Sequence, residues 1–540
     1  MNKLWIMLLA TPFLIAALIV NFLFSTDNIS LAQKAENTAM AGNYARAEKV
    51  YDEMLNADPL NVKLNRDKIR SHFNIPENTG KSSYRDDNPI TIKYKGLANS
   101  SNLQEADIGL YGLGYIEIMQ GNSDKAIEYY LQVKNSSLPY LNNSIGYVYL
   151  SKKNYSEAES YFLKEIEAET NVSGAYSNLA QVYEANKDDL KLKELLANSE
   201  TNQYVSERLI RHHLYEKGDY KEYSAYAFKL GNYTTTGLVG AVLILIVWIV
   251  FLLWIDVYET EKVRHILFAL ALGCGFSMLA TPLYDFYFVS LGWELNGNYL
   301  NDLLYCIFAI GVIEEAVKII PFLILLRFKS IINESMDYIV YASVCALGFA
   351  FMENIMYFHE SGLDDLLSRS LSATILHMTL TSFVAYGLMY AKYKGNGGSE
   401  RYFTFAFFAA CLVHGLYDFW ILSDGWVGQF RIFSLLILFY AVQRYALAIA
   451  NALNHSEFSL GKGQLVRSAE YLGLALTIVA AYQYTVIGYK FGAENANINF
   501  FTMLISSAFL AYILVTVLGN IKVTNGEWVS ILKMKSQNED

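Results

Sequence analysis

Hydrophobic residues are distributed unevenly along the chain, and their pattern divides it into two kinds of sequence. Residues 25–233 are polar and rich in tyrosine, whereas nearly all of residues 238–518 consist of apolar runs separated by short loops. An apolar run of about 20 residues is long enough to cross a bilayer as a helix. The pattern therefore predicts an all-α fold in which a polytopic membrane domain follows a soluble helical domain.

About ten apolar runs are long enough to be membrane spans. The first, at residues 1–24, is longer than the core of an ordinary signal peptide, which favours an uncleaved anchor over a cleaved signal. The others are expected at 236–256, 265–288, 303–327, 337–358, 372–391, 403–422, 432–452, 469–489 and 499–519. Lysine and arginine are concentrated in alternate loops, so the positive-inside rule places both termini in the cytoplasm and residues 25–235 outside it.

These spans imply four parts of the chain. They are an anchor or signal segment (1–25), an extracytoplasmic domain (26–233), a multi-span domain (234–522) and a cytoplasmic tail (523–540). The formal charge of -10 and the absence of a basic cluster with interleaved aromatic residues exclude nucleic acid as a partner. All four cysteines, at 274, 306, 345 and 411, lie in apolar runs, which predicts neither a disulfide framework nor a CxxC metal site.

The extracytoplasmic domain contains a helical pattern that repeats. Gly114, Gly121, Ala126, Tyr130 and Val133 recur as Gly146, Lys153, Ala158, Phe162 and Glu165. Small residues at helix crossings, each followed by an aromatic residue, resemble the tetratricopeptide repeat over 31–64 and 106–230. Residues 65–102 lack the pattern and are expected to form a loop or an irregular insertion. Stacked helix pairs of this kind present a concave surface, so a protein partner or substrate is expected there, the alternative being a mere spacer.

Three charged residues interrupt the apolar run at 303–328: Glu314, Glu315 and Lys318. Each charge at the centre of a membrane helix costs about 2.5–3.5 kcal/mol, so three cost roughly 7–10 kcal/mol. Other helices are therefore expected to shelter this polar face. An ion pair between Glu314 and Lys318, which are i and i+4 on one helix, would explain two charges and leave Glu315 unexplained.

Three neighbouring runs bring further polar groups to a similar depth: Glu353, Asn354, His377, His414 and Asp418. Carboxylates and imidazoles together can activate water, the carboxylate as a general base and the imidazole as a proton relay, an oxyanion donor or a metal ligand. A zinc site built from His377, His414 and Glu353 is chemically reasonable. The chain has no HExxH spacing, so the sequence itself does not establish a metal.

Four motifs on these runs resemble the PrsW family of bacterial intramembrane proteases, which are distant relatives of the CAAX-processing proteases. The motifs are EEAVK (314–318), GFAFMEN (348–354), Arg369 with His377, and HGLYD (414–418), and the resemblance covers about 260–425. It implies peptide-bond hydrolysis in a bacterial inner membrane. The residues that match the family's active-site positions are Glu314, Glu315, Glu353 and His414, with His377 as a further member.

We assign each of these residues a hypothetical role. We expect Glu315 to activate water, Glu314 to be held by Lys318 or to share a proton with its neighbour, Glu353 and His414 to complete a water or metal site, Asp418 to orient His414, and His377 to stabilise the oxyanion. Asn354 is expected to support the site. The family is grouped with metallopeptidases, and a glutamate-based mechanism without metal is the alternative. One member cuts a membrane-bound anti-sigma factor, which suggests membrane-protein substrates and a role in signalling.

Two other functions compete with this hypothesis. A proton-coupled transporter or channel also places ionisable groups at mid-membrane, but it predicts related halves, and the last runs contain no counterpart of EEAVK. A receptor or scaffold that has lost catalysis should lack one of the motif carboxylates, and all of them are present.

Overall fold

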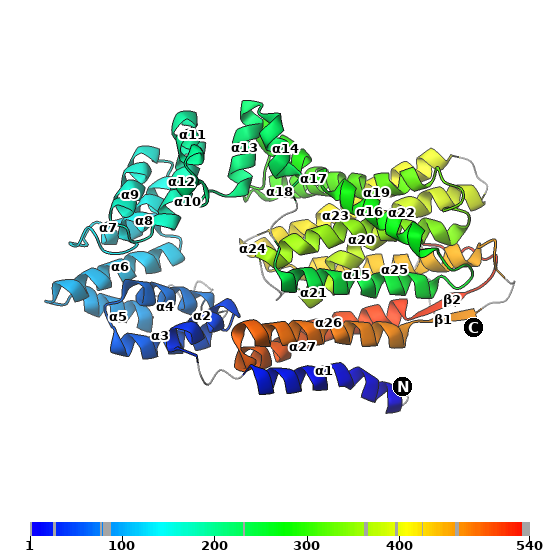
Figure 1. Ribbon diagram of the computed structural model, residues 1–540, viewed down its shortest axis with the longest axis horizontal. Coiled ribbons are helices and arrows are strands. Elements are labelled where there is room, and N and C mark those ends of the chain that lie inside the picture. Colours follow the sequence, from blue (N-terminus) through cyan, green and yellow to red (C-terminus); the bar gives the residue numbers. More distant parts are fainter. Residues whose placement is uncertain are drawn as a thin grey trace. The chain divides into compact units, whose positions relative to one another are not determined.

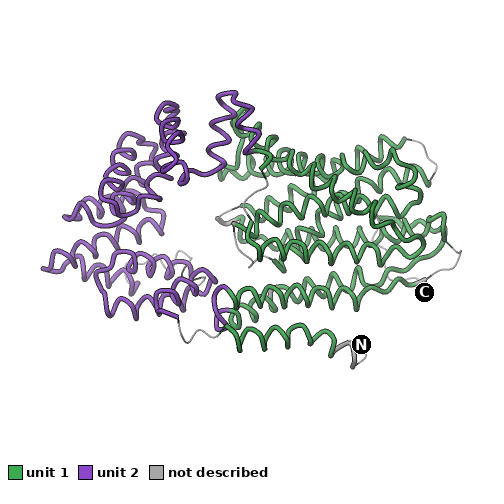
Figure 2. The backbone as a smooth tube through the Cα atoms, in the orientation of Figure 1, with its two compact units in different colours: residues 1–24, 227–489, 496–540 green, residues 25–226, 490–495 purple. Residues whose placement is uncertain are grey.

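The computed structural model describes residues 3–24, 29–75, 78, 88–229, 233–360, 366–394, 398–423, 425–459 and 464–531. The chain forms two compact units (Figure 2), which we name the membrane unit (residues 1–24, 227–489 and 496–540) and the polar unit (residues 25–226 and 490–495). Within the described ranges the secondary structure is helical apart from one two-stranded ribbon (Figure 1), so the all-α prediction is confirmed.

The polar unit is a succession of short helices. They are α2 (Leu31–Met40), α3 (Tyr44–Ala57), α4 (Val62–Asn74), α5 (Pro89–Ala98), α6 (Leu103–Met119), α7 (Ser123–Tyr130), α8 (Leu141–Ser151), α9 (Tyr155–Glu167), α10 (Val172–Ala185), α11 (Asp189–Ala197), α12 (Ser199–Asn202), α13 (Glu207–Lys217) and α14 (Tyr220–Ala227). A Cβ added to Gly114 would lie 2.5 Å from the Tyr130 ring, and one added to Gly146 would lie 2.7 Å from the Phe162 ring. Helices α6 and α7 therefore cross in the same way as α8 and α9, one repeat later.

The stretch at 65–102 was expected to lack regular structure, and that prediction is wrong. Helix α4 covers its beginning and α5 its end, with Asn61 and Asn88 as N-caps. Tyr94 is fully buried and donates a hydrogen bond to Asn65 Oδ1 at 2.7 Å. A Cβ on Gly112 would lie 2.2 Å from the Tyr94 ring. The Tyr94 ring therefore packs on a glycine of α6, as the Tyr130 ring packs on Gly114 and the Phe162 ring on Gly146.

The membrane unit contains the long apolar helices. They are α1 (Lys3–Leu23), α15 (Thr235–Ile255), α16 (Val263–Ser277), α20 (Ser335–Glu360), α22 (Ala373–Lys394), α23 (Ser399–Leu422), α25 (Ile432–Asn454), α26 (Ala469–Phe491) and α27 (Ala493–Leu518). Shorter elements connect or extend them: α17 (Ala280–Asp285), η3 (Phe286–Ser290), α18 (Tyr299–Tyr305), η4 (Cys306–Gly311), α19 (Val312–Leu325), α21 (Leu366–Leu371) and α24 (Gly425–Gly428). Strands β1 (Gln464–Arg467) and β2 (Asn520–Val523) pair antiparallel, with Gln464 opposite Val523.

Seven helices in the described ranges are long and apolar enough to cross a membrane, and an eighth is reached if the two bent parts of α27 are one span. The protein is thus a multi-pass membrane protein. The expected total of about ten spans remains a prediction, because the apolar part of α1 is short and the run with the glutamate pair carries three charged residues. That run is helical nevertheless, through α18, η4 and α19 in succession.

Close helix crossings bring α19 and α23 together. A Cβ on Gly311 would lie 2.5 Å from the Cys411 carbonyl oxygen, and one on Gly415 would lie 2.4 Å from the Ile307 Cα. Both contacts involve η4, a stretch of π-helix, and such wide turns are frequent at functional sites. As a result α19 begins beside the part of α23 that carries His414.

Candidate active site

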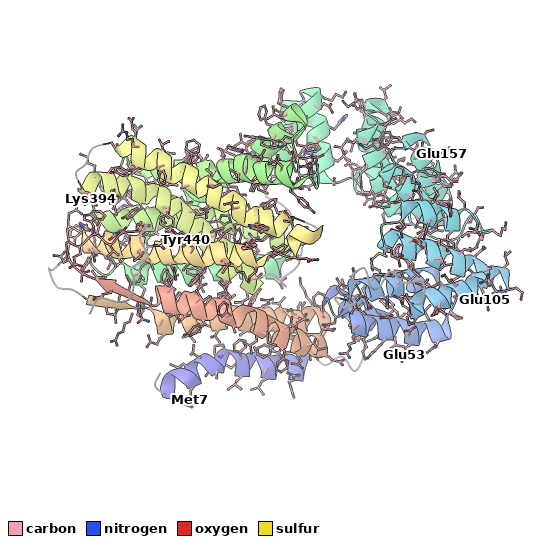
Figure 3. The ribbon with its side chains drawn as sticks, turned by 180° about the vertical axis from the view of Figure 1, so that it is seen from behind. Met7, Glu53, Glu105, Glu157, Lys394 and Tyr440 are labelled. Carbon is pink, nitrogen blue, oxygen red and sulfur yellow. The ribbon has the colours of Figure 1, made fainter. Side chains whose placement is uncertain are left out.

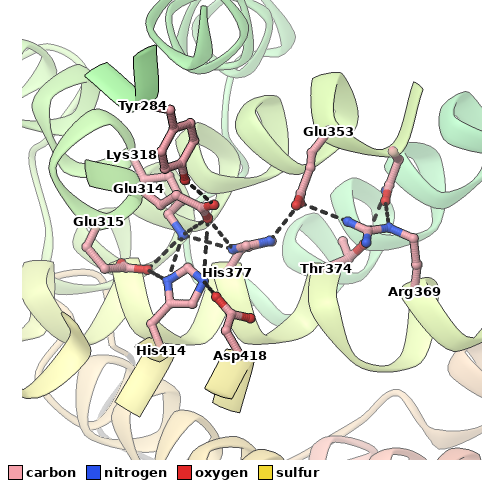
Figure 4. Close-up of polar contacts among 11 residues, drawn as sticks. Tyr284, Glu314, Glu315, Lys318, Glu353, Arg369, Thr374, His377, His414 and Asp418 are labelled. Atoms are coloured by element: carbon pink, nitrogen blue, oxygen red, sulfur yellow. Dashed lines mark hydrogen bonds and ion pairs between the residues drawn. The ribbon is translucent and has the colours of Figure 1, made fainter. Parts of the chain in front are cut away.

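Five helices of the membrane unit contribute the polar residues singled out in the sequence, and the structure brings all of them into one cluster (Figure 4). The residues are Glu314, Glu315 and Lys318 from α19, Glu353 and Asn354 from α20, Arg369 from α21, His377 from α22, and His414 and Asp418 from α23. They are mostly buried, and Glu315 and Lys318 have no exposed surface. The contacts of these charges with one another offset the cost of burying them.

Lys318 pairs with the second glutamate rather than the first. Its Nζ lies 2.7 Å from Glu315 Oε1 but 3.5 Å from Glu314 Oε2. The ammonium group also approaches the two imidazoles, at 2.8 Å from His377 Nδ1 and 3.5 Å from His414 Nδ1. Glu315, which the i, i+4 argument had left unexplained, is therefore the main partner of Lys318.

Glu315 also fixes the orientation of His414. Its Oε1 lies 2.8 Å from His414 Nδ1, and Thr381 donates a hydrogen bond to its Oε2 at 3.3 Å. With Nδ1–H directed at this carboxylate, the other ring nitrogen, Nε2, is left 3.4 Å from both Glu314 Oε2 and Asp418 Oδ2. Glu315 is thus nearer to the imidazole than Asp418, which had been expected to orient it.

His377 is oriented by a second carboxylate. Its Nε2 lies 3.0 Å from Glu353 Oε2, so Nδ1 faces Lys318 and Glu314, the latter at 3.9 Å. Arg369 holds Glu353 in place, with Nη2 2.8 Å from the same carboxylate oxygen and Nε donating to Asn354 Oδ1 at 2.6 Å. Asn354 thus contacts the arginine that holds Glu353.

A cavity of about 650 Å³ opens onto one side of the cluster. Its charged and histidine lining residues are Glu314, Glu353, Arg369, His377, His414 and Asp418, and its apolar lining includes Phe349, Met352, Met356, Leu376 and Ile421. Glu315 and Lys318 are not part of this lining. The expectation that Glu315 activates water therefore conflicts with the geometry, since a reacting group in the cavity would meet Glu314 and not Glu315.

Three residues are placed to hold a metal ion: Glu314, His377 and His414, whose ligand atoms lie within 4.8 Å of one another. The environments of Glu314 and His414 fit a cation such as zinc, whereas His377 Nδ1 is already in contact with Lys318 Nζ at 2.8 Å. Glu314 Oε2 is buried and has no hydrogen-bond partner in the described part of the chain. Each imidazole directs its other nitrogen at a carboxylate, the usual outer shell of a metal-binding histidine. Glu353, which had been expected to be a ligand, occupies that outer shell.

The sequence did not indicate Tyr284. This residue of α17 donates a hydrogen bond to Glu314 Oε1 at 2.8 Å, which leaves Oε2 as the oxygen that faces the imidazoles. The chain has 41 tyrosines, so the presence of Tyr284 in an apolar run does not distinguish it from the others. Only the packing of α17 against α19 identifies it.

The fold is that of a polytopic membrane protein, and its buried cluster of carboxylates and imidazoles can support hydrolysis. Residues 261–444 match the model of the PrsW family intramembrane metalloprotease, so this part of the chain is similar to those proteases, and the protein is a peptidase. The match begins where the motif resemblance begins and extends further, through the first half of α25.

Curated relatives agree with this assignment. Protease PrsW of Clostridioides difficile is 25% identical over 211 residues, which are 37% of this chain and 85% of that protein. Protease PrsW of Oceanobacillus iheyensis is 28% identical over 192 residues (36% and 86%), and that of Bacillus subtilis 23% over 190 residues (35% and 84%). No solved structure matches the chain. The proton-coupled transporter and the silent scaffold are not favoured by these relatives.

Proposed function

We propose that the protein is a bacterial inner-membrane protease that hydrolyses peptide bonds of membrane-associated proteins in the cavity bordered by Glu314, His377 and His414. One observation carries the proposal. Two imidazoles from different helices converge with Glu314 on the wall of the cavity, and each imidazole is backed by its own carboxylate. Such preorganisation suits activation of water, and a mere structural ion pair does not require it.

In the first form of this proposal a divalent metal such as zinc is held by Glu314, His377 Nδ1 and His414 Nε2. When bound, such a metal activates water and polarises the scissile carbonyl. The chain's own residues prepare the donors: Glu353 and Glu315 hold the two imidazoles, and Tyr284 holds Glu314.

Asp418 is the cavity carboxylate best placed to accept a proton from the attacking water. It lies 3.4 Å from His414 Nε2, and no described lysine or arginine lies within 4.0 Å of it. Glu353 is a poorer base, because Arg369 is 2.8 Å away and stabilises its negative charge.

Lys318 supports a second form that uses no metal. Its ammonium group lies 2.8 Å from His377 Nδ1, so a cation bound to that nitrogen and a hydrogen bond from Lys318 to it exclude one another. In this form His377 is held on both sides, by Lys318 and by Glu353. Glu314 and His414 Nε2, 3.4 Å apart on the cavity wall, would then share the proton taken from water.

We further propose that the polar unit is exported and binds the substrate or a partner protein. The charge bias of the loops supports export, and the repeated helix crossings support an extended helical-repeat surface. A role in regulated signalling follows only by analogy with the family. Labelling of single cysteines introduced into the polar unit, from outside intact cells, tests the orientation.

Comparison of membrane proteomes tests the activity itself. Cells that produce wild type, Glu314→Gln or His414→Ala protein at equal levels are compared for membrane proteins that accumulate uncut. Glu470→Gln, an exposed glutamate at the start of α26 and outside the family match, is the matched control. We expect the same proteins to accumulate in the first two variants and none in the control. Indistinguishable proteomes in all four strains would refute the proposal.

Metal analysis then separates the two forms. Purified wild-type protein should contain about one equivalent of zinc in the first form, and His414→Ala protein should contain much less. Wild-type protein that cleaves its substrate after removal of all transition metals would support the metal-free form.

A further inference from the structure

Four buried carboxylates, which we call the acidic cluster, meet at one end of the membrane unit. They are Asp256 and Glu261 in the connection between α15 and α16, Glu334 just before α20, and Asp337 in the first turn of α20. Hydrogen bonds join the segments that carry them. The Glu261 Oε2 atom accepts from the hydroxyl of Tyr341 in α20, and Glu334 Oε2 accepts from that of Ser456, which follows α25. The acidic cluster thus connects three parts of the membrane unit.

The acidic cluster lies where α22 ends and α20 begins. Tyr338, which follows Asp337, has its ring centre 6.4 Å from that of Tyr393 near the end of α22. Lys394, labelled in Figure 3, marks this end of the membrane unit. The basic side chain that approaches here, Lys392, has its Nζ over the rings of Tyr338 and Tyr393, at 5.5 and 4.7 Å from their centres. It therefore contacts aromatic rings rather than the carboxylates.

Half of the carboxylate oxygens in the acidic cluster lack a hydrogen-bond donor. Both oxygens of Asp256, Glu334 Oε1 and Asp337 Oδ1 are buried and have no hydrogen-bond partner in the described part of the chain. Asp337 Oδ2, by contrast, accepts from the backbone N–H groups of Asn333 and Glu334 at 2.6 and 2.9 Å. The carboxyl groups of Asp337 and Glu261 also lie within hydrogen-bond distance of one another. Two ionised carboxylates in such contact repel one another unless a proton or a cation lies between them.

The acidic cluster also lacks a counter-charge. Within the ranges that the structure describes, no lysine, arginine or histidine forms an ion pair with any of its four carboxylates. Burial, together with the charges of Glu334 and Glu261, raises the pKa of Asp256 to about 8, and burial raises that of Glu334 to about 7. Both residues lie just outside the apolar spans. Buried polar groups without a partner usually indicate an ordered water or a bound ion, and uncompensated buried charges are costly.

We propose that the acidic cluster binds one divalent cation of the hard class, Mg²⁺ or Ca²⁺, between the carboxylates of Glu261 and Asp337. Such cations prefer oxygen ligands, and Mg²⁺ keeps several of its waters when one or two carboxylates hold it. Those waters donate hydrogen bonds to the unpaired oxygens of Asp256 and Glu334. One ion therefore accounts for both the missing counter-charge and the missing donors. The site is distinct from that of Glu314, His377 and His414, where nitrogen donors suit zinc.

The cation has a structural consequence for the membrane unit. It joins the connection between α15 and α16 to the first turn of α20, and Ser456 extends this link to the end of α25. Helix α20 also carries Glu353, the partner of His377 in the candidate active site. We therefore expect the cation to stabilise the helix that positions this glutamate.

Thermal unfolding of the full-length protein in detergent tests the proposal, with MgCl₂ or CaCl₂ added after treatment with EDTA. The buffer is mildly alkaline, because a carboxylate must lose its proton to bind a metal ion. At least one of the two salts should raise the unfolding midpoint of the wild type saturably, and by more than NaCl of equal ionic strength. Asp256→Asn removes a water-mediated contact and should weaken the apparent affinity about 10- to 100-fold, and Asp337→Asn, which removes a direct ligand, should weaken it further. Glu400→Gln, an exposed glutamate in the first turn of α23, is the matched control.

The same variants distinguish a cation from protons shared among the carboxyl groups. In EDTA, Asp256→Asn should be at least as stable as the wild type, because it removes an uncompensated charge and no hydrogen bond. With saturating Mg²⁺ or Ca²⁺ the wild type should become the more stable of the two. Asp256→Asn thus keeps the test valid even if Asp337→Asn, which alters the bonds to Asn333 and Glu334, does not fold.

Three results would overturn the proposal. A midpoint that rises no more with either divalent salt than with NaCl would leave shared protons as the explanation of the acidic cluster. A response that both variants retain, or that Glu400→Gln reduces equally, would indicate non-specific screening. A response lost only in His414→Ala would place the ion at the candidate active site. The measurement requires no substrate and is independent of the proposed proteolysis.

Discussion

Replacing Glu315 by glutamine should destabilise the membrane unit far more than replacing its neighbour Glu314. Glu315 is fully buried and lies 2.7 Å from Lys318 Nζ and 2.8 Å from His414 Nδ1. Removing one member of a buried ion pair leaves an uncompensated charge and typically costs about 3–5 kcal/mol. The contact of Glu314 with Lys318 is longer, 3.5 Å, and borders the cavity, so its loss should cost much less.

For activity the order is reversed. Glu314→Gln removes a carboxylate that faces the reacting water or a metal ion, and the loss should be about 10²- to 10⁴-fold. Glu315→Gln removes only the group that orients His414, and loss of such an outer partner costs about 10- to 100-fold per folded molecule. The two variants therefore separate the positioning glutamate from the reacting one.

The assay pairs two measurements on purified protein. Thermal unfolding in detergent is followed by size-exclusion chromatography of heated samples, and cleavage of a substrate identified from the proteomes is normalised to folded protein. Glu470→Gln serves again as the control. Adding Lys318→Met to Glu315→Gln should recover part of the lost stability, since it removes the charge left unpaired. A Glu315→Gln protein with wild-type stability and less activity than Glu314→Gln would refute this reasoning and favour Glu315 as the base.

Two further predictions concern the rest of the membrane unit. Gly273→Val should destabilise it by about 1–3 kcal/mol in thermal unfolding, because a Cβ there would lie 2.2 Å from the Cys345 carbonyl oxygen; Gly275→Val, with nothing within 4 Å, should not. Burial and the charge of Glu334 raise the pKa of Asp256, just beyond the end of α15, to about 8. The folded protein thus loses stability relative to an Asp256→Asn variant as pH rises from about 4 towards 8. The stabilising effect of Asp256→Asn should be larger at pH 8.5 than at pH 5.5, and an equal effect at both would contradict the assignment.

The hydrophobic pattern was sufficient to predict the helices of the membrane unit. Every run expected to be a span contains a helix in the structure, even the run at 303–327 with its three charges. The pattern failed at 65–102, where buried positions are occupied by polar and aromatic residues such as Asn65 and Tyr94, which a search for small residues at fixed spacing does not detect. It also could not show that residues 490–495, between the last two runs, belong to the polar unit.

The motifs predicted which residues lie close together, but not the chemical role of each. Adjacent residues on a helix point about 100° apart, so Glu314 and Glu315 need not face the same cavity, and here Glu314 lines it whereas Glu315 does not. Which one does so depends on the rotation of α19 about its axis, and η4 and the crossings at Gly311 and Gly415 determine that rotation. No pattern within the run itself contains this information. For the same reason the sequence favoured Glu353 as a metal ligand, whereas in the structure Glu314 is the glutamate that approaches both imidazoles, at 3.9 Å from His377 Nδ1 and 3.4 Å from His414 Nε2.

The balance of charge in the cluster is compatible with both forms of the proposed mechanism, the metal-bound form and the metal-free form. Four carboxylates meet there, and among the described residues the lysine and arginine in contact with them are Lys318 and Arg369. Among these residues two negative charges are therefore left without a cation, in a site largely shielded from water. Protons taken up within the cluster would neutralise them, and so would one divalent ion bound to Glu314, His377 and His414. Because metal ligands must give up their protons, the two states should exchange with pH, and the acidic side of that exchange favours the metal-free form.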